Sequence, residues 1–540
     1  MLSSGVQGPF ALLGRVRYLH NMVAKPIVPL ALTSSLVEPT FDGVIVVSHS
    51  LEALTNHAQF KVLAHQLTEQ SSHGVLNRPG FLLHTELPSK RLFYSPVSFG
   101  NHDFDDIRKY RHAGEQGIAL ALSSGVKNPL LAVVPNTDHP NALVVAALGV
   151  FHKLHVPLNI RQEESNRSQK VERLGVLSTG SFHSSETLKL LDALQSSFAV
   201  CRDIGDTDPQ RMAPGPAASY VQEHFKGTEI KVTIEDNVET LKKEFPLLAA
   251  VSRGCNHIDP HKARLLFLEY ENREDSGKPF ETIFLIGKGV TLDTGGLDLK
   301  VNGAMLGMSR DKYGSAVVAG FFDALDKLKP KGLKVVGLMA MVRNSCGSAS
   351  YSCDEIITSR SGKRILIGNT DAEGRLAMLD PLTYARELAL KEDNPHLYTL
   401  ATLTGHEVLA YGYFPAIIDN AVARSAGHAQ NLQKVGDEWG QPLEVSRLHV
   451  EDFDFNKSPV ESADLRQANN RPSVQTLRGH QSPCAFLIQA SRLDEHGISS
   501  QKPIRYSHID IGSSMGEYPA TTFPCPLLAL SAKHIFPRLS

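Results

Sequence analysis

Cysteine is scarce in this chain: six cysteines stand among 540 residues, and no two of them form a C-x-x-C pair. This usage argues against a disulfide framework and against a cysteine zinc site, and it favours a reducing compartment. Long apolar runs are also lacking, because the longest, such as Leu143–Phe151, reach about half of the roughly 20 residues that a membrane helix needs. Charge of one sign is not in excess, with 55 Lys and Arg against 57 Asp and Glu. The sequence therefore predicts neither a membrane partner nor a nucleic-acid partner.

Hydrophobic residues make up 42% of the chain, enough for more than one buried core. In the first half, strand-like runs at Val44–Val47, Leu130–Pro135 and Gly175–Leu177 alternate with helical stretches such as Ala142–Leu154. We expect a smaller N-terminal α/β domain over residues 38–183.

The second half repeats this alternation at greater length. Apolar strand-like runs lie at Thr282–Ile286, Leu333–Met341, Tyr398–Leu403 and Ile504–Ile511, with helical patterns between them. This order predicts a mostly parallel central sheet covered by helices, in a C-terminal domain over residues 216–540. Residues 184–215, a helical pattern followed by proline-rich breaks, are predicted to link the two domains.

The first 37 residues contain no acidic residue, carry three basic ones and place apolar residues at helical spacing. Mitochondrial transit peptides have this composition, and a docked or disordered arm has it too. We interpret residues 1–37 as a leader or an arm.

Five charged side chains follow predicted strands of the second half: Lys288, Asp293, Asp311, Asp371 and Glu373. The first two lie in a glycine-rich segment after an apolar strand, and loops after strand ends bind ligands in parallel sheets. The last two are two residues apart, and an extended segment would project both to the same side.

Four carboxylates and one amine suit Mn²⁺, Mg²⁺ or Zn²⁺, and two ions can share such ligands. A metal-bound lysine must be neutral, which requires a lowered pKa. The spacing alone also fits a simpler arrangement, in which Lys288 pairs with Asp293 while Asp371 and Glu373 cap turns.

Read together, several segments resemble, in order and spacing, the signatures of the leucyl aminopeptidase family of dinuclear metallopeptidases (family M17). These are residues 287–296, Lys300, Met308 with Asp311, residues 369–376 and residues 401–405. Residues 369–376 form the most specific signature. The resemblance covers roughly residues 203–540, and the N-terminal half matches only in its size and α/β character.

The resemblance implies two divalent ions per chain, zinc or manganese, with magnesium and cobalt as alternatives. Lys288, Asp293, Asp311 and Glu373 would bind one ion, and Asp293, Asp371 and Glu373 the other. Asp293 and Glu373 would bridge the two ions.

The same resemblance assigns two catalytic residues, Lys300 and Arg375. Lys300 would stabilise the oxyanion, and Arg375, with Gly374 and Leu403, would hold a bicarbonate ion that acts as general base. The pocket for the first side chain would be lined by Met308, Thr402, Gly405, Gly512 and Met515. Methionine and glycine favour an apolar first residue such as Leu or Met.

The chain departs from the family at Lys312 and Tyr313, which follow Asp311 and would bring a cation and a ring close to the metals if they pointed inward. Pro381 is expected to interrupt the helix after Arg375. These features indicate a divergent branch, similar to animal proteins named only as probable aminopeptidases.

We therefore predict a metal-dependent aminopeptidase that acts on peptides through a hydroxide between two metals. By resemblance it would be a homohexamer. The sparse cysteines favour a cytoplasmic location, with mitochondrial import as the alternative. The alternative function is a metal-binding, catalytically weak oligomeric scaffold or regulator.

Overall fold

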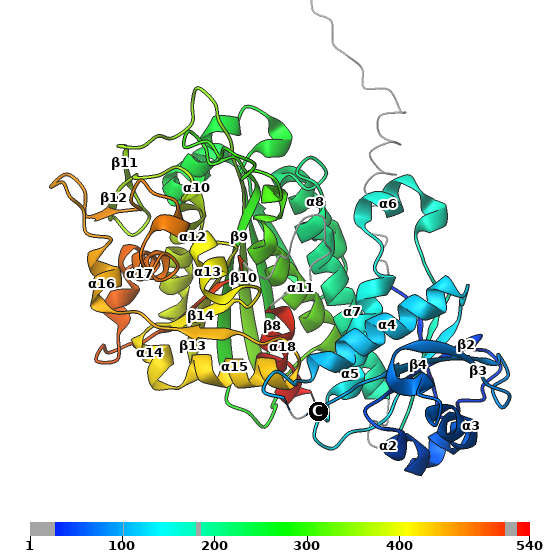
Figure 1. Ribbon diagram of the computed structural model, residues 1–540. Coiled ribbons are helices and arrows are strands. Elements are labelled where there is room, and N and C mark those ends of the chain that lie inside the picture. The colour runs from blue at the N-terminus through cyan, green and yellow to red at the C-terminus, as the bar shows by residue number, and fades with distance from the viewer. Residues whose placement is uncertain (1–26, 101, 180–184, 513–525, 540) are drawn as a thin grey trace, which may run out of the picture. The chain divides into compact units, whose positions relative to one another are not determined.

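The computed structural model in Figure 1 describes residues 27–100, 102–179, 185–512 and 526–539. Its contacts divide the chain into two compact units. Residues 27–199 and 435–441 form the N-terminal unit, and residues 200–434 and 442–539 form the C-terminal unit. The division falls inside helix α7 (Ser185–Asp206), within the segment predicted as the link. Residues 435–441 join the N-terminal unit although they lie far along the chain, which no sequence pattern indicated.

The N-terminal unit is an α/β fold around a six-stranded sheet of order β1-β6-β5-β2-β4-β3, in which only β3 runs antiparallel to its neighbour. Its strands are β1 (Leu30–Thr33), β2 (Gly43–Ser48), β3 (Gly80–Leu83), β4 (Arg91–Pro96), β5 (Pro129–Val133) and β6 (Leu174–Leu177). Its helices are α2 (Leu51–Asn56), α3 (Lys61–Ser71), α4 (Arg108–Ser123), α5 (Ala142–Leu154), α6 (Leu158–Glu163) and the first part of α7.

Strand β1 lies within the segment predicted as a leader or an arm. Residues 1–26 lie outside the described residues, but β1 pairs in parallel with β6, Leu30 opposite Leu174 and Thr33 opposite Leu177. Because its backbone completes this sheet, the end of the predicted segment belongs to the folded unit.

The C-terminal unit is built on an eight-stranded sheet of order β15-β14-β17-β13-β9-β10-β8-β7. The strands are β7 (Lys231–Glu235), β8 (Arg264–Asn272), β9 (Glu281–Asp293), β10 (Leu333–Asn344), β13 (Pro395–Ala401), β14 (Ala416–Asp419), β15 (Glu444–Ser446) and β17 (Arg505–Asp510). The four central strands, β17, β13, β9 and β10, are parallel, and antiparallel pairs lie on both sides of them. A small sheet of β11 (Ile356–Thr358), β12 (Arg364–Leu366) and β16 (Leu465–Arg466) lies apart from it.

Helices cover both faces of this sheet because alternate strand residues point to opposite sides. Ile286, Leu338 and Ala340 share a buried cluster with α12, whereas a side chain at Gly337 would meet Phe322 of α11. The helices of the unit are α8 (Pro214–His224), α9 (Val238–Glu244), α10 (Pro246–Val251), α11 (Tyr313–Leu328), α12 (Glu373–Ala389), α13 (Gly405–Tyr411), α14 (Ala421–Ser425), α15 (His428–Glu438), α16 (Val450–Asp454), α17 (Gln481–Ala490) and α18 (Leu527–His534).

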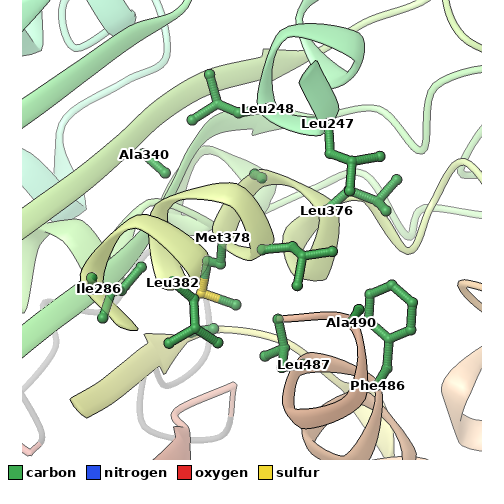
Figure 2. Close-up of a cluster of buried hydrophobic side chains, with 14 of the residues drawn as sticks. Leu247, Leu248, Ile286, Ala340, Leu376, Met378, Leu382, Phe486, Leu487 and Ala490 are labelled. Atoms are coloured by element: carbon green, nitrogen blue, oxygen red, sulfur yellow. The ribbon is translucent and has the colours of Figure 1, made fainter. Parts of the chain in front are cut away.

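Figure 2 shows the cluster that holds α12 in place. Met378 and Leu382 of α12 lie between Ile286 of the sheet and Leu487 of α17, and all four are fully buried. The predicted interruption at Pro381 is wrong, because α12 continues through it to Ala389. A proline inside a helix costs about 3 kcal/mol, and the continuous burial of residues 373–383 of this helix offsets that cost.

The five described cysteines, which exclude only Cys525, are free thiols. Among the helices that the structure describes, none combines the length and apolarity needed to cross a bilayer.

Candidate functional site

Lys288 and Asp293 lie on β9 itself and not in a loop after it, so that part of the prediction is wrong. The strand continues to Asp293 because β10 pairs with it as far as Asn344, which stands opposite Asp293. Both side chains are buried, with 3% exposure each. They point from the carboxyl-terminal part of a central strand, where parallel sheets form ligand sites.

Asp311 follows a 3₁₀ turn, η6 (Met308–Arg310), and precedes α11 by two residues. It does not cap that helix. Its Oδ1 accepts a hydrogen bond from Thr402 Oγ1 at 2.7 Å and lies 2.8 Å from Lys288 Nζ. Asp311 is thereby held against the strand that carries Lys288.

Asp371 and Glu373 do not lie in an extended segment, which corrects the predicted geometry. Asp371 sits in a turn, where its N–H donates to Asn369 Oδ1 at 2.8 Å, and Glu373 is the first residue of α12. Nevertheless, the Asp371 carboxylate lies next to Lys300, and the Glu373 carboxylate lies next to Lys288.

The two lysines divide the carboxylates between them. Lys288 Nζ lies 2.8 Å from both Asp311 Oδ1 and Glu373 Oε1, and Lys300 Nζ lies 3.0 Å from Asp293 Oδ2 and 2.5 Å from Asp371 Oδ1. The alternative ion pair between Lys288 and Asp293 does not form. Carboxylate oxygens of Asp293, Asp311 and Glu373 lie within 4.8 Å of one another.

The charges in this cluster shift one another's protonation. Burial lowers the pKa of Lys288, but the carboxylates of Asp311, Glu373 and Asp293 outweigh it and hold the pKa above the usual range. Burial and, after it, the neighbouring Asp293 carboxylate together raise the pKa of Asp371 to about 7. Without cations, therefore, both lysines are ammonium ions and the carboxylates repel one another.

The residues present fit divalent cations. Asp311 Oδ2 and Glu373 Oε2 are buried, and no described residue offers either oxygen a hydrogen bond. Buried polar atoms of this kind are rare unless a ligand satisfies them. Carboxylate oxygens are the donors that hard divalent ions prefer.

Three further residues support the cluster and were not predicted as site residues. Asn344 Nδ2 donates to Asp293 Oδ1 at 2.8 Å and to the Thr370 carbonyl at 3.1 Å. Gln467 Nε2 donates to the carbonyls of Asn369 and Ala372 at 2.7 and 2.8 Å. Tyr351 OH donates to the Thr370 carbonyl at 2.7 Å. Only Asn344 carried a usable signal, since it follows the predicted strand Leu333–Met341 by three residues and ends β10 in the structure.

Arg375 is 6% exposed, and its Nη1 donates to the Gln467 carbonyl at 2.9 Å. Its Nε has no hydrogen-bond partner in the described part of the chain, and burial lowers the pKa of the guanidinium to about 10. Gly374 packs on Lys288: a Cβ there would lie 2.7 Å from Nζ. The Leu403 N–H already donates to Asp510 Oδ1 at 3.0 Å.

One pocket of about 350 Å³ brings the predicted site residues together. It is lined by the five predicted metal ligands, Lys300, Arg375, Gly374, Leu403, Met308, Thr402, Gly405 and Gly512. Met515 lies outside the described residues. The lining also includes residues that sequence reasoning missed: Ala304, Val408, Phe455, Asn469, Arg471 and Val474 among them.

Lys312 and Tyr313 do not point into this pocket. Lys312 is fully buried, and its Nζ donates to the Ser309 carbonyl and to the Thr207 carbonyl, the latter at 2.9 Å. The Tyr313 ring packs against Gly205 at the end of α7. Both residues anchor the segment behind Asp311 and leave the pocket free.

A family model, described as the catalytic domain of the cytosol aminopeptidase family, matches residues 199–528. The chain is 55% identical over 454 residues to a Caenorhabditis elegans protein named “Putative aminopeptidase”, covering 84% of this chain and 86% of that protein. It is 31% identical over 327 residues to a Chlamydia trachomatis protein named “Probable cytosol aminopeptidase”, covering 60% of this chain and 59% of that protein.

Solved structures share the fold over nearly the whole chain. A leucyl aminopeptidase from Trypanosoma brucei in complex with bestatin superposes with a TM-score of 0.77 at 19% identity, covering 97% of this chain and 99% of that chain. The bottromycin maturation enzyme BotP in complex with Mn superposes with a TM-score of 0.71 at 18% identity, covering 91% of this chain and 98% of that chain. The first match covers the N-terminal half as well, where the sequence resemblance was limited to size and α/β character.

Proposed function

Because the chain belongs to the cytosol aminopeptidase family and is a metal-dependent aminopeptidase, we propose that it removes apolar first residues, such as Leu or Met, from peptides. One observation carries this proposal. The pocket is lined by four carboxylates that form ion pairs with two lysines. Two of the carboxylate oxygens are buried and have no hydrogen-bond partner in the described part of the chain.

We assign Lys288, Asp293, Asp311 and Glu373 to one divalent ion, and Asp293, Asp371 and Glu373 to the other. When bound, the two ions supply Lewis-acid polarisation of the peptide carbonyl and a water molecule of lowered pKa. Zinc and manganese both suit this donor set, and magnesium and cobalt are alternatives.

Lys288 must lose its proton to act as a ligand. In the metal-free structure its ammonium pairs with the carboxylates of Asp311 and Glu373. Cations that bind these carboxylates would neutralise the charges that raise the pKa of Lys288. Gly374 leaves the space in which the amine lies, because a side chain there would collide with Nζ.

Lys300 would stabilise the oxyanion that develops on the scissile carbonyl. Its ammonium, 15% exposed, is the more accessible of the two lysine side chains, and its pKa is raised because Asp293 and Asp371 outweigh the effect of burial. In the metal-free protein Lys300 is therefore charged at neutral pH, and it would have to keep this charge when ions occupy Asp293 and Asp371, as an oxyanion donor must.

Arg375 would hold a bicarbonate ion that accepts the proton of the attacking water. The Nε–H of its buried guanidinium, for which the described residues offer no acceptor, and the N–H of Gly374, in the first turn of α12, are suited to bind such an anion. The Leu403 N–H is committed to Asp510, so Leu403 would contribute to the shape of the anion site and not a donor.

The first side chain of the substrate would lie against Met308, Thr402, Gly405, Gly512 and Met515. Met308 adapts to apolar groups, and the glycines leave room beside it. Lys312, which would bring a cation close to the metals if it pointed inward, donates its hydrogen bonds away from the pocket. An acidic first residue would then be desolvated without a partner in this subsite.

The function is tested by hydrolysis of leucine p-nitroanilide by the purified protein with added Mn²⁺, Zn²⁺ or Co²⁺. We expect metal-dependent turnover that Asp371→Ala and Lys300→Ala lower by at least about 100-fold. Turnover no higher in the wild-type protein than in these variants would instead favour the catalytically weak scaffold or regulator.

A panel of dipeptides that differ only in the first residue tests the substrate preference. Leucine and methionine should show the highest kcat/KM, and higher values for Asp or Glu would contradict the apolar pocket.

We also propose a cytoplasmic homohexamer, on the basis of family resemblance and free cysteines. Light scattering should return about six times the chain mass of 59.0 kDa, and a monomer mass at micromolar concentration would contradict it.

A further inference from the structure

Four basic side chains line the metal pocket, and one of them differs from the others. Lys288, Lys300 and Arg375 are largely buried and hydrogen-bonded or paired within the site. Arg471 is exposed, and its guanidinium makes no hydrogen bond or ion pair with any residue that the structure describes. Among the four basic side chains of the pocket lining, Arg471 is thus the one that forms no hydrogen bond or ion pair with a described residue.

The backbone that carries Arg471 is held in a defined place. The Arg471 N–H donates to Asn469 Oδ1 at 3.3 Å, and Thr476 Oγ1 bonds to the Asn469 side chain and, at 3.1 Å, to the Pro472 carbonyl. The next residues form a 3₁₀ turn, η7 (Ser473–Gln475). Ser473 Oγ accepts the Gly405 N–H at 3.0 Å, which fixes the turn to the start of α13 at the pocket.

A second arginine in this segment, Arg478, differs from Arg471 because its guanidinium is hydrogen-bonded within the protein. Arg478 Nε and Nη2 donate to both oxygens of Asp452, at 2.6 and 2.8 Å, and Nη2 also donates to the Arg447 carbonyl. Arg478 therefore stabilises the segment, whereas Arg471 has its donors available at the pocket. A guanidinium with available donors recognises planar carboxylates through paired hydrogen bonds.

The position of Arg471 indicates which part of a peptide it meets. A free N-terminus that reaches the buried carboxylates and Lys288 leaves the rest of the peptide to run outward toward the exposed rim, where Arg471 lies. The segment begins at Gln467, whose carbonyl binds Arg375, so it lies beside the reacting groups. Any carboxylate that Arg471 meets would then be downstream of the scissile bond.

We propose that Arg471 is a specificity-determining residue that binds a substrate carboxylate on the leaving side of the scissile bond. The carboxylate has two sources, the C-terminus of a dipeptide or an acidic side chain at the second residue. This inference rests on the proposed function and adds to it a preference for short or acidic leaving portions, independent of the apolar first residue.

The first test is equilibrium binding to the metal-loaded full-length protein, with probes that cannot be hydrolysed. These are Leu-Gly with its peptide bond reduced to CH₂–NH, and the C-terminal amide of the same compound. Wild-type protein should bind the acid about tenfold more tightly than the amide, because only the acid offers the guanidinium a carboxylate for paired, charge-assisted hydrogen bonds. In Arg471→Ala the ratio should fall below about threefold.

A second pair of probes separates the two sources of the carboxylate. Reduced Leu-Glu amide and reduced Leu-Gln amide both lack a C-terminal carboxylate and differ only in the charge of the second side chain. A preference for Leu-Gly acid alone identifies the chain terminus, and a preference for Leu-Glu amide alone identifies the side chain.

The matched control is Arg447→Ala. Arg447 is also exposed, and its side chain has no bonded partner among the described residues, but it does not line the pocket. This variant removes the same charge and should keep the wild-type preference. The proposal is overturned if wild-type protein binds neither probe pair with a carboxylate preference, or if Arg471→Ala keeps it.

Failure of this inference is separable from failure of the proposed function. Leucine p-nitroanilide has no carboxylate, so its metal-dependent hydrolysis does not depend on Arg471. Hydrolysis of that reporter with equal binding of acid and amide would overturn only the role of Arg471. Absent hydrolysis with an Arg471-dependent carboxylate preference would overturn only the proposed function.

Discussion

Asn344 joins two segments that supply carboxylates. Its amide donates to Asp293 on β9 and to the Thr370 carbonyl beside Asp371, and its side chain is fully buried. Partners of this kind orient ligands, and their loss lowers metal affinity about 10- to 100-fold.

We therefore expect Asn344→Leu to weaken Mn²⁺ binding by about 10- to 100-fold, because Asp293 Oδ1 keeps the Gly295 N–H but loses its side-chain donor. Titration of the metal-free protein with Mn²⁺ measures it. Asn77→Leu, an exposed change in the N-terminal unit, is the control and should bind as wild type. An unchanged affinity in Asn344→Leu would contradict the orienting role.

Asp380 is a fully buried carboxyl in α12, the helix that begins at Glu373. Its Oδ2 accepts the Leu247 N–H at 2.7 Å and its Oδ1 accepts the Arg360 N–H at 2.8 Å. Burial raises the pKa of Asp380 to about 7, although these donors oppose the rise.

This shift predicts a pH dependence of stability. Because the folded pKa is above the unfolded value of about 3.9, the contribution of Asp380 is fully present below about pH 4 and is lost as pH rises through about 7. The free energy of unfolding of the wild-type protein, relative to Asp380→Asn, should fall by about 2 kcal/mol between pH 5 and pH 7. Urea unfolding of the metal-free proteins measures this difference. A constant or rising difference would mean that Asp380 stays ionised in this range.

At the scale of elements, the packing of α11 on the sheet determines how close the start of this helix lies to Lys288. Gly314, in the first turn of α11, lies directly on the sheet: a Cβ there would be 2.0 Å from the Leu400 carbonyl oxygen and 2.9 Å from the Lys288 N. Real Cβ contacts do not come so close, so only glycine allows this approach.

Gly314→Ala should therefore push α11 away from β9 and β13 and lower the free energy of unfolding by about 1–3 kcal/mol, as overpacking does. Thermal unfolding measures the loss, and metal affinity should fall with it because Asp311 precedes this helix. Gly497→Ala is the control, since a Cβ there would have only an ordinary contact of 3.9 Å. Equal stability of the two variants would show that α11 can shift without strain.

For the whole molecule, metal binding and folding are coupled. The fold brings Asp293, Asp311, Asp371 and Glu373 together, and their mutual repulsion is relieved only in part by the two lysines. A ligand that binds only the folded chain stabilises it by about 2.7 kcal/mol at 100 times its Kd.

Removal of metal with EDTA should lower the melting temperature, and re-addition of Mn²⁺ should restore it. The saturated protein should hold two ions per chain by elemental analysis. Glu373→Gln, which changes a predicted bridging ligand, should show a smaller response to EDTA than wild type. Fewer than two ions at saturation would contradict the dinuclear assignment.

Some features of this protein follow from sequence alone. Helix α5 has the predicted bounds Ala142–Leu154, and the predicted strands correspond to β2, β5, β6, β10, β13 and β17 within a few residues, whereas β9 continues past the predicted end at Ile286 to Asp293. Local periodicity determines these elements, because apolar residues that recur at helix or strand spacing lie on one face only when the segment forms that element. Signature order also indicated the family, since its residue types follow each other at characteristic spacing.

Tertiary structure alone decided which residues meet. Lys288 pairs with Asp311 and Glu373 instead of Asp293, Lys312 turns to the Thr207 carbonyl, and Gln467 spans nearly 100 residues to reach Asn369. None of these contacts has a local signal, because each partner comes from a different element and its position depends on how the helices pack on the sheet. The sequence thus determined the kinds of ligands at the site, and packing determined their pairing, since side-chain contacts across a fold depend on distances that spacing along the chain does not contain.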